Sequence, residues 1–233
     1  MLSIYIGWDQ RETVAWQVLA HSILRRSSSL VNLIPLRQEA LREEGVYRRQ
    51  VDTLASTEFS LTRFLVPYLS GYEGYSLFLD CDMLCLKDVT LLFEMAYRDP
   101  SKAVWVVKHS YVPQTMMKMD NKPQAVYPRK NWSSVMLFNN ALCHTLTPQY
   151  VTHATPQQLH RFEWVDDRLI GELPREWNWL CGEYDYNAQA ALLHYTLGGP
   201  WFKNVPVTNE NRPWVQEYYS MTDRNPHFLM EST

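Results

Sequence analysis

The sequence predicts an α/β protein built on a mixed, mostly parallel sheet. Residues 2–8, 31–36 and 75–84 are short apolar runs, as expected of strands that are buried on both faces. Residues 12–28, between the first two runs, carry apolar side chains at helical spacing. Strand, helix, strand is the order that a parallel sheet with crossover helices requires. With 233 residues, the chain is long enough for one domain with a full core.

This alternation continues to about residue 140 and is then lost. The further elements that we expect are helices at 56–72 (capped by Ser56 or Thr57), 89–99 and 155–164, and strands at 102–109 and 133–140. The proline-containing stretch 110–129 is expected to form a loop. Beyond residue 164 we expect isolated motifs rather than strands, packed irregularly on the domain.

Composition and charge are those of an ordinary globular protein. Hydrophobic residues make up 46% of the chain and charged residues 20%. The formal net charge of -3 gives no basic field for nucleic acid or an anionic membrane. No apolar run reaches the roughly 18 residues that span a bilayer, and no signal peptide is recognisable, so we expect a cytoplasmic location. The four cysteines match no zinc pattern and are expected to be reduced core thiols.

The stretch "LFLDCDMLCLKD", residues 77–88, places two carboxylates at the end of an apolar strand. An ionised carboxylate is costly to bury unless it is paired or bound to a metal. Asp80 and Asp82 point to the same face of a strand, and ligands of open α/β sheets bind at the carboxyl ends of strands. Oxygen ligands suit Mg²⁺ or Mn²⁺, which keep positions open for substrate phosphates. The pair therefore predicts a divalent ion that holds a diphosphate.

Two other interpretations of this pair remain open. Asp80 could cap a turn while Asp82 forms a surface ion pair, which is the ordinary explanation of Asp-x-Asp in a sequence. Phosphatases of the haloacid dehalogenase type also place Asp-x-Asp after an apolar strand, with the first Asp as nucleophile. That motif belongs to the first strand and usually has Thr or Val where this chain has Leu84, so it is the weaker match.

Several segments, in order along the chain, resemble the glycosyltransferases of GT-A fold, and most closely glycosyltransferase family 8, the glycogenin and lipopolysaccharide galactosyltransferase group. "IYIGWDQRE", "LTRFLVPYL" and "FLDCDMLCLKDVTLLF" are similar to its opening strand, a helix with an Arg, and its metal strand. "NWSSVMLFNN", "VDDRLI", "LPREWNW" and "LHYTLGGPW" are similar to later segments. The resemblance implies one Rossmann-like GT-A domain over residues 1–233. Residues 1–109 would be its nucleotide- and metal-binding half, and 110–233 its acceptor-side half.

The resemblance also implies a metal site and a phosphate site. Asp80 and Asp82 would hold Mn²⁺ or Mg²⁺, with His194 as the third protein ligand. A lone His in an apolar context can equally be a satisfied core residue. Gly198 and Gly199 would bring backbone N–H groups close to the phosphates.

Further residues are assigned by the resemblance to the donor sugar. Asp166 and Asp167 would lie at the transferred sugar as the catalytic carboxylates. The family's Lys before its last Pro-Trp is absent here, and Lys203 is the candidate substitute. The other implied donor-binding residues are Tyr5, Gly7, Asp9, Arg63, Cys81, Ser134 and Asn178.

The expected activity is metal-dependent transfer of a sugar from a nucleotide-diphosphate sugar, expected to be a UDP-sugar, to a hydroxyl of a carbohydrate or glycoconjugate acceptor. The resemblance implies retention of anomeric configuration. Acceptor specificity is expected to lie in residues 110–129 and the C-terminal tail. The alternatives to this activity are a nucleotidyltransferase of similar fold, the phosphatase named above, and a non-catalytic sugar-binding module, which 9 Trp and 14 Tyr would permit.

Overall fold

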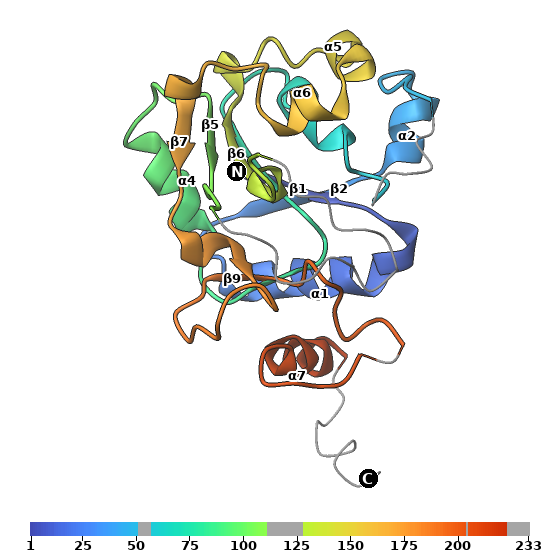
Figure 1. Ribbon diagram of the computed structural model, residues 1–233, viewed down its shortest axis with the longest axis vertical. Coiled ribbons are helices and arrows are strands. Elements are labelled where there is room, and N and C mark those ends of the chain that lie inside the picture. Colours follow the sequence, from blue (N-terminus) through green and yellow to red (C-terminus); the bar gives the residue numbers. More distant parts are fainter. Residues whose placement is uncertain (51–56, 111–127, 204, 223–233) are drawn as a thin grey trace, which may run out of the picture.

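A computed structural model describes residues 1–50, 57–110, 128–203 and 205–222 of the protein (Figure 1). Within these residues the main sheet has six strands in the order β2-β1-β3-β6-β5-β7. The strands are β1 (Leu2–Gly7), β2 (Val31–Leu36), β3 (Tyr75–Leu79), β5 (Val104–Val106), β6 (Val135–Asn139) and β7 (Ile170–Glu172). β1 is parallel to β2 and β3, and β5 to β7, whereas β6 is antiparallel to both of its neighbours. The predicted mixed, mostly parallel sheet is confirmed.

The centre of this sheet is β3, which leads to the carboxylate pair. Its last three residues, Leu77, Phe78 and Leu79, are fully buried. This burial follows from its position, because β1 lies on one side of β3 and β6 on the other. The run "YSLFL" is continuously apolar after Ser76, as expected of a strand covered on both faces.

A second sheet shows that the expectation of no strands beyond residue 164 was wrong. In the described residues this sheet has the order β4-β9-β8, with β4 at Met83–Cys85, β8 at Trp179–Leu180 and β9 at Leu192–His194. β7 also lies beyond residue 164, at the edge of the main sheet. Strands of two or three residues are too short to show an alternating pattern, and their pairing partners specify them instead.

The helices cover the sheet on opposite sides. They are α1 (Thr13–Arg26), α2 (Gln38–Glu43), α3 (Val66–Leu69), α4 (Thr90–Tyr97), α5 (Pro148–His153), α6 (Pro156–His160) and α7 (Arg212–Met221). In the view of Figure 1, α1 and α7 lie below the β1–β2 edge, and α2, α5 and α6 lie above it. The predicted helix start at Thr155 is correct, since Thr155 and Gln158 form a capping box and Pro156 occupies the first turn.

The predicted helix over 56–72 is shorter than expected. The chain forms a 3₁₀ turn, η2 (Thr62–Leu65), followed by the single helical turn α3. Pro67 lies in the first turn of α3, and a proline there cannot donate the N–H that a continuous helix would need. The short turns still bury Arg63, Phe64 and Leu65, so they place an arginine inside the molecule.

The remaining predictions concern cysteines, membrane spans and loops. All four cysteine side chains are buried free thiols. Among the described residues, no helix combines the length and apolar character that a bilayer crossing requires. Ser56 and most of 110–129, with the predicted cap, loop and acceptor contacts, lie outside the described residues, as does the C-terminal tail from residue 223.

Candidate metal centre and cavity

The two carboxylates of "LDCD" lie where the chain passes from one sheet to the other. β3 ends at Leu79 and β4 begins at Met83. Asp80 is held to the main sheet, because its N–H donates to the Ser134 carbonyl (3.1 Å). Asp82 is held to the second sheet, because its carbonyl accepts from Tyr195 N–H (2.9 Å). The backbone on each side of the pair is therefore fixed by a different sheet.

His194 comes to the same place at the end of β9. β9 pairs antiparallel with β4, in a register that sets His194 opposite Met83. His194 Nε2 lies 3.3 Å from Asp82 Oδ1 and 3.8 Å from Asp80 Oδ2. One ligand atom from each of the three residues lies within 4.8 Å of the others. The tertiary structure thus assembles the three predicted metal ligands into one cluster.

Asn178 fixes the orientation of the His194 ring. It ends η6 (Arg175–Asn178) and is completely buried. Its Nδ2 donates to Ser134 Oγ (2.8 Å) and to the Asn131 carbonyl (3.2 Å), so its Oδ1 faces His194 Nδ1 at 2.8 Å. An amide oxygen can only accept, so His194 carries its proton on Nδ1. Nε2 is the nitrogen that faces the two carboxylates.

This donor set fits a divalent cation. Two carboxylates and a neutral imidazole Nε2 are suitable ligands for Mn²⁺ or Mg²⁺. Ligand atoms at about 2.1 Å from such an ion lie about 3 Å from one another in octahedral geometry, close to the separations in the cluster. His194, at 2% exposed, offers a neutral ligand whose second nitrogen is already hydrogen-bonded, which is the usual arrangement of metal-binding histidines.

Arg63 connects the cluster to the rest of the cavity. Its Nη1 lies 2.8 Å from Asp80 Oδ1 and donates to the Ser133 carbonyl (2.9 Å). The guanidinium also lies over the rings of Phe59 and Phe78, at 5.2 and 4.9 Å from their centroids. At 5% exposed, Arg63 is a fixed positive charge, and the structure rules out a helix-surface position for it.

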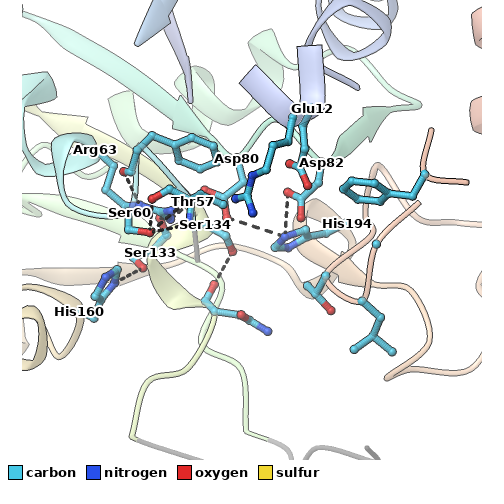
Figure 2. A pocket seen from close by; sticks show the side chains of 17 residues that line it. Glu12, Thr57, Ser60, Arg63, Asp80, Asp82, Ser133, Ser134, His160 and His194 are labelled. Carbon is cyan, nitrogen blue, oxygen red and sulfur yellow. Dashed lines mark hydrogen bonds and ion pairs between the residues drawn. The ribbon is translucent and has the colours of Figure 1, made fainter. Parts of the chain in front are cut away.

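A cavity of about 320 Å³ opens over these side chains. Of the predicted site residues, six line it: Arg63, Asp80, Asp82, Ser134, His194 and Gly198. Figure 2 shows Glu12, Asp82 and His194 at one end of the cavity and Ser133 and His160 at the other. The cavity therefore has an acidic, metal-suited end and an end that carries a hydroxyl and an imidazole.

Glu12 adds a third carboxyl group to the acidic end. It precedes α1 and accepts a hydrogen bond from Cys81 Sγ (3.1 Å). Burial raises the pKa of Glu12 to about 8, and the neighbouring Asp82 carboxylate adds to this rise. Cys81 itself is fully buried, and this burial raises the pKa of its thiol. Cys81 contacts the acidic end of the cavity through its hydrogen bond to Glu12.

Ser133 and His160 form a hydrogen-bonded pair at the opposite end. Ser133 Oγ lies 2.8 Å from His160 Nδ1. His160 ends α6, and its ring meets that of Phe64 edge-on, with centroids 5.3 Å apart. Burial, together with the Arg63 charge, lowers the pKa of His160 to about 3. The imidazole is therefore neutral at physiological pH.

Four residues predicted to bind the donor lie behind the cavity wall. Tyr5 is a core residue, and its hydroxyl accepts from Ser70 (3.1 Å). Gly7 is needed for packing, because a side chain there would collide with the Phe59 ring. Asp9 is 1% exposed and binds Arg11. Burial alone would raise the pKa of Asp9, but the hydrogen bonds from Arg11 and Glu58 outweigh it and hold the pKa below its usual value. Asn178, completely buried as described above, contacts His194.

The glycine segment differs in detail from the prediction. Gly198 lines the cavity with a φ of 101°, but its N–H donates to the Tyr195 carbonyl (2.8 Å) rather than facing the cavity. Gly199 makes room for the ring of Trp201, which a Cβ would overlap. Lys203 is exposed and is not among the cavity-lining residues.

The predicted catalytic carboxylates lie outside the cavity lining and bind arginines. Asp166 accepts from Arg168 Nε and Nη2 (3.0 and 2.9 Å), and these bonds lower the pKa of Asp166 to about 2. Asp167 Oδ2 accepts from Arg129 Nη2 (2.6 Å). Arg129 also donates to the Arg161 carbonyl, which ties this loop to the end of α6. In this conformation neither carboxylate faces the cavity.

Sequence reasoning missed Glu12, Ser133 and His160. Ser133 is next to the predicted Ser134 in "NWSSV". The two serines differ in the direction of their side chains, which the sequence does not show. His160 has no local signal, since a polar residue at the end of a predicted helix is ordinary. Glu12 could have been found as an acid placed next to the turn that follows a first strand.

Comparison with known proteins gives one close relative by sequence. No family model matches the chain. Protein CDI of Arabidopsis thaliana is 46% identical over 206 residues, which cover 85% of this chain and 79% of the plant protein.

Comparison with solved structures gives glycosyltransferases of GT-A fold. The bifunctional glycosyltransferase WbbM has a TM-score of 0.62 at 14% identity, covering 98% of this chain, and the chain spans only 50% of WbbM. The galactosyltransferase LgtC, in complex with donor and acceptor sugar analogues, has a TM-score of 0.55 at 13% identity, covering 98% of this chain and 99% of that one. Mouse xyloside xylosyltransferase 1 has a TM-score of 0.56 at 13% identity, covering 89% of this chain and 99% of that one. At such identities the likeness establishes the GT-A fold.

Proposed function

The chain belongs to the family of Protein CDI of Arabidopsis thaliana, and we propose that it is a metal-dependent glycosyltransferase. The donor would be a nucleotide-diphosphate sugar, most simply a UDP-sugar, and the acceptor a hydroxyl of a carbohydrate or glycoconjugate. The resemblance of its ordered motifs to glycosyltransferase family 8 supports the further proposal that transfer occurs with retention. The GT-A fold supports this proposal.

One observation carries the proposal. Asp80, Asp82 and His194 come from separate segments, converge at the carboxyl end of β3, and face a cavity of about 320 Å³. A cavity of this kind, with a hard-ligand cluster at one end, suits a diphosphate with groups attached on both sides.

The residues of the cavity would divide the work of transfer. A bound divalent ion would neutralise the charge that develops on the leaving diphosphate. Asp80, Asp82 and His194 would hold that ion, and Asn178 would keep His194 in the correct tautomer. Arg63 would orient the donor beside Asp80 through its fixed guanidinium.

Asp166 and Asp167 keep their proposed catalytic role under one condition. Each carboxylate would have to leave its arginine partner and turn toward the cavity before it could contact a donor. The Asp166–Arg168 pair is exposed, at 47% and 88% for the two side chains, and an exposed pair costs little to break. In the other pair Asp167 is 72% exposed but Arg129 only 23%.

We propose that the chain forms a single functional domain. Residues 1–109 supply the two carboxylates and Arg63, and residues 110–233 supply His194, Ser133 and His160. Because both halves line the same cavity, we propose that neither half acts alone.

The test is release of UDP from a panel of UDP-sugars, with Mn²⁺ and with chelator, for wild type and Asp82→Asn. We expect one donor to be hydrolysed slowly, with metal dependence, and at least about a hundredfold loss in the variant. Asp99→Asn is the matched control, because Asp99 is partly exposed, is not among the cavity-lining residues, and accepts hydrogen bonds from the nearby Ser101.

Other products would identify the alternatives. Pyrophosphate release from a nucleoside triphosphate would indicate a nucleotidyltransferase. Metal-independent sugar binding without turnover would indicate a binding module. If wild type neither binds UDP with Mn²⁺ nor releases it from any donor, the proposed function is wrong.

A further inference from the structure

We propose that Ser133 and His160 form a pair that reads a hydroxyl group of the donor's sugar and so selects which sugar is transferred. The inference rests on the proposed function, because it needs a diphosphate held at the metal end. It assigns to this chain a specificity-determining residue, Ser133, and a positioning residue, His160, which acts through Ser133.

The order of the main sheet places the pair on the sugar side. β3, which ends at the metal-binding carboxylates, lies between β1 and β6. The turn after β1, with Asp9 and Arg11, is therefore on one side of the diphosphate position. Ser133, in η3 (Trp132–Ser134) just before β6, is on the other side. A nucleotide and a sugar attached to opposite ends of a diphosphate would occupy these two sides, and the first βα turn is the usual nucleotide side of such sheets.

Contacts around Arg63 put the pair within reach of the same ligand. Arg63 donates to the Ser133 carbonyl and pairs with Asp80, so one side chain joins the hydroxyl end of the cavity to the metal end. Both Ser133 and His160 line the cavity (Figure 2). A sugar next to the diphosphate would therefore face the Ser133 side chain.

The chemistry of the pair suits a hydroxyl group. With a neutral imidazole, either Ser133 Oγ donates to His160 Nδ1 or Nδ1–H donates to Ser133 Oγ. In the first state Ser133 can only accept from a ligand, and in the second it can donate to one. A sugar hydroxyl, which both donates and accepts, can match either state, whereas a hydrogen in its place leaves the serine with His160 alone and its remaining hydrogen-bonding position unused.

The pair is also held rigidly enough to discriminate. The His160 ring is packed edge-on against Phe64, and α6 begins with the Thr155–Gln158 capping box. Ser133 is 6% exposed, and its backbone is fixed by the Arg63 hydrogen bond. Buried polar groups that a wrong ligand leaves unpaired give the strongest discrimination among substrates.

The experiment measures the dissociation constants of intact UDP-sugars and of UDP by calorimetry in the presence of Mn²⁺. The sugars differ at one hydroxyl, as UDP-glucose and UDP-galactose do, with deoxy analogues of the preferred donor. For wild type we expect one epimer to bind at least about tenfold more tightly than another. Ser133→Ala should reduce that ratio about tenfold, while the dissociation constant of UDP changes less than twofold.

His160 is tested by two substitutions. His160→Ala should lower the ratio as Ser133→Ala does, and the double variant should lower it no further, because both changes remove one interaction. His160→Asn should restore most of the ratio, since its amide can occupy the place of Nδ1. A merely structural role would not be rescued in this way. His153→Asn, at the corresponding end of α5, is the control for loss of a helix-terminal histidine.

Each other outcome overturns the inference. Equal affinity of wild type for all epimers, or an unchanged ratio in Ser133→Ala with UDP binding intact, contradicts the hydroxyl-reading role alone. If Ser133→Ala weakens UDP itself as much as the UDP-sugars, the residue serves the nucleotide side instead. No metal-dependent UDP binding by wild type would remove the proposed function and this inference together. Ser133→Ala deletes one oxygen, so it keeps the test valid if His160→Ala fails to fold.

Discussion

At the scale of single residues, the proposed metal site depends on a side chain that is not one of its ligands. Asn178 accepts from His194 Nδ1, and its amide is held by Asn131 and Ser134. A flipped amide would place Nδ2 against Nδ1 and force His194 into the wrong tautomer. The two hydrogen bonds that Nδ2 donates therefore determine which nitrogen of His194 can bind an ion.

Asn178→Ala should weaken Mn²⁺ binding about 10- to 100-fold, because His194 loses the group that orients it. The measurement is a calorimetric titration with Mn²⁺ at saturating UDP. Asn32→Ala, at an exposed position of β2, is the control and should leave Mn²⁺ binding unchanged. Wild-type affinity in Asn178→Ala would mean that His194 is positioned by its strand alone.

At the scale of elements, a buried acid on α7 pairs with two residues of α1. Glu217 on α7 is 3% exposed, and its carboxylate lies 2.7 Å from His21 Nδ1 and 2.8 Å from Arg26 Nη2. Burial alone would raise the pKa of Glu217, but its bonds to Arg26 and His21 outweigh that effect and lower it. α1 also packs on β4, so α7 supports the strand that directly follows Asp82.

Glu217→Ala should lower the free energy of unfolding by about 2 kcal/mol, since it leaves the Arg26 charge near the interface without its carboxylate. Urea unfolding measures this change. Glu39→Ala removes a surface pair in which Glu39 is 74% exposed, and it should change stability by less than about 0.5 kcal/mol. Equal effects of the two substitutions would show that the α1–α7 contact does not depend on Glu217.

At the scale of the whole molecule, the cavity exists because two sheets meet. β3 ends in the main sheet, β4 begins the second, and the carboxylates occupy the connection.

Buried histidines lie around this junction. His109 is 7% exposed, and its Nδ1 lies 2.8 Å from the Tyr184 hydroxyl oxygen. Burial lowers the pKa of His109 to about 3, as it does for His160, and the nearby Arg175 charge acts in the same direction at His109.

These histidines should make the protein less stable as the pH falls from 7.5 to 5.5. An unfolded imidazole binds a proton below about pH 6.5, whereas the buried ones stay neutral down to about pH 3. The unfolded state then binds more protons, so the free energy of unfolding decreases, by about 1.4 kcal/mol for each histidine over these two pH units. Urea unfolding at several pH values measures the slope.

His109→Gln should reduce this slope, and His144→Gln, which replaces an exposed ring stacked on Tyr72, should not. The comparison of variants is needed because Glu12, with a pKa raised to about 8, works in the opposite direction. Its contribution is present at low pH and is lost as the pH rises toward 8. An equal slope in wild type and His109→Gln would show that His109 takes up protons equally in the folded and unfolded states.

The sequence by itself determined the class of fold and one part of the site. The apolar runs that became β1, β2 and β3, and the helical spacing that became α1, are local patterns with a direct physical cause in burial. Asp80 and Asp82 could be identified because two charges at the end of such a run conflict with burial unless something binds them. His194 and Arg63 came from resemblance, and the structure brought both to the cluster.

Only the tertiary structure decided how these residues are joined. Pairing of β9 with β4 sets His194 beside the carboxylates, and hydrogen bonds link Asn178 to His194 and Ser133 to His160. The same packing turned Tyr5 and Gly7 into core positions and directed Asp166 and Asp167 to arginines. Such contacts join residues distant in the chain or depend on the direction of a side chain. Local periodicity carries no information about either, because it records only which residues are buried.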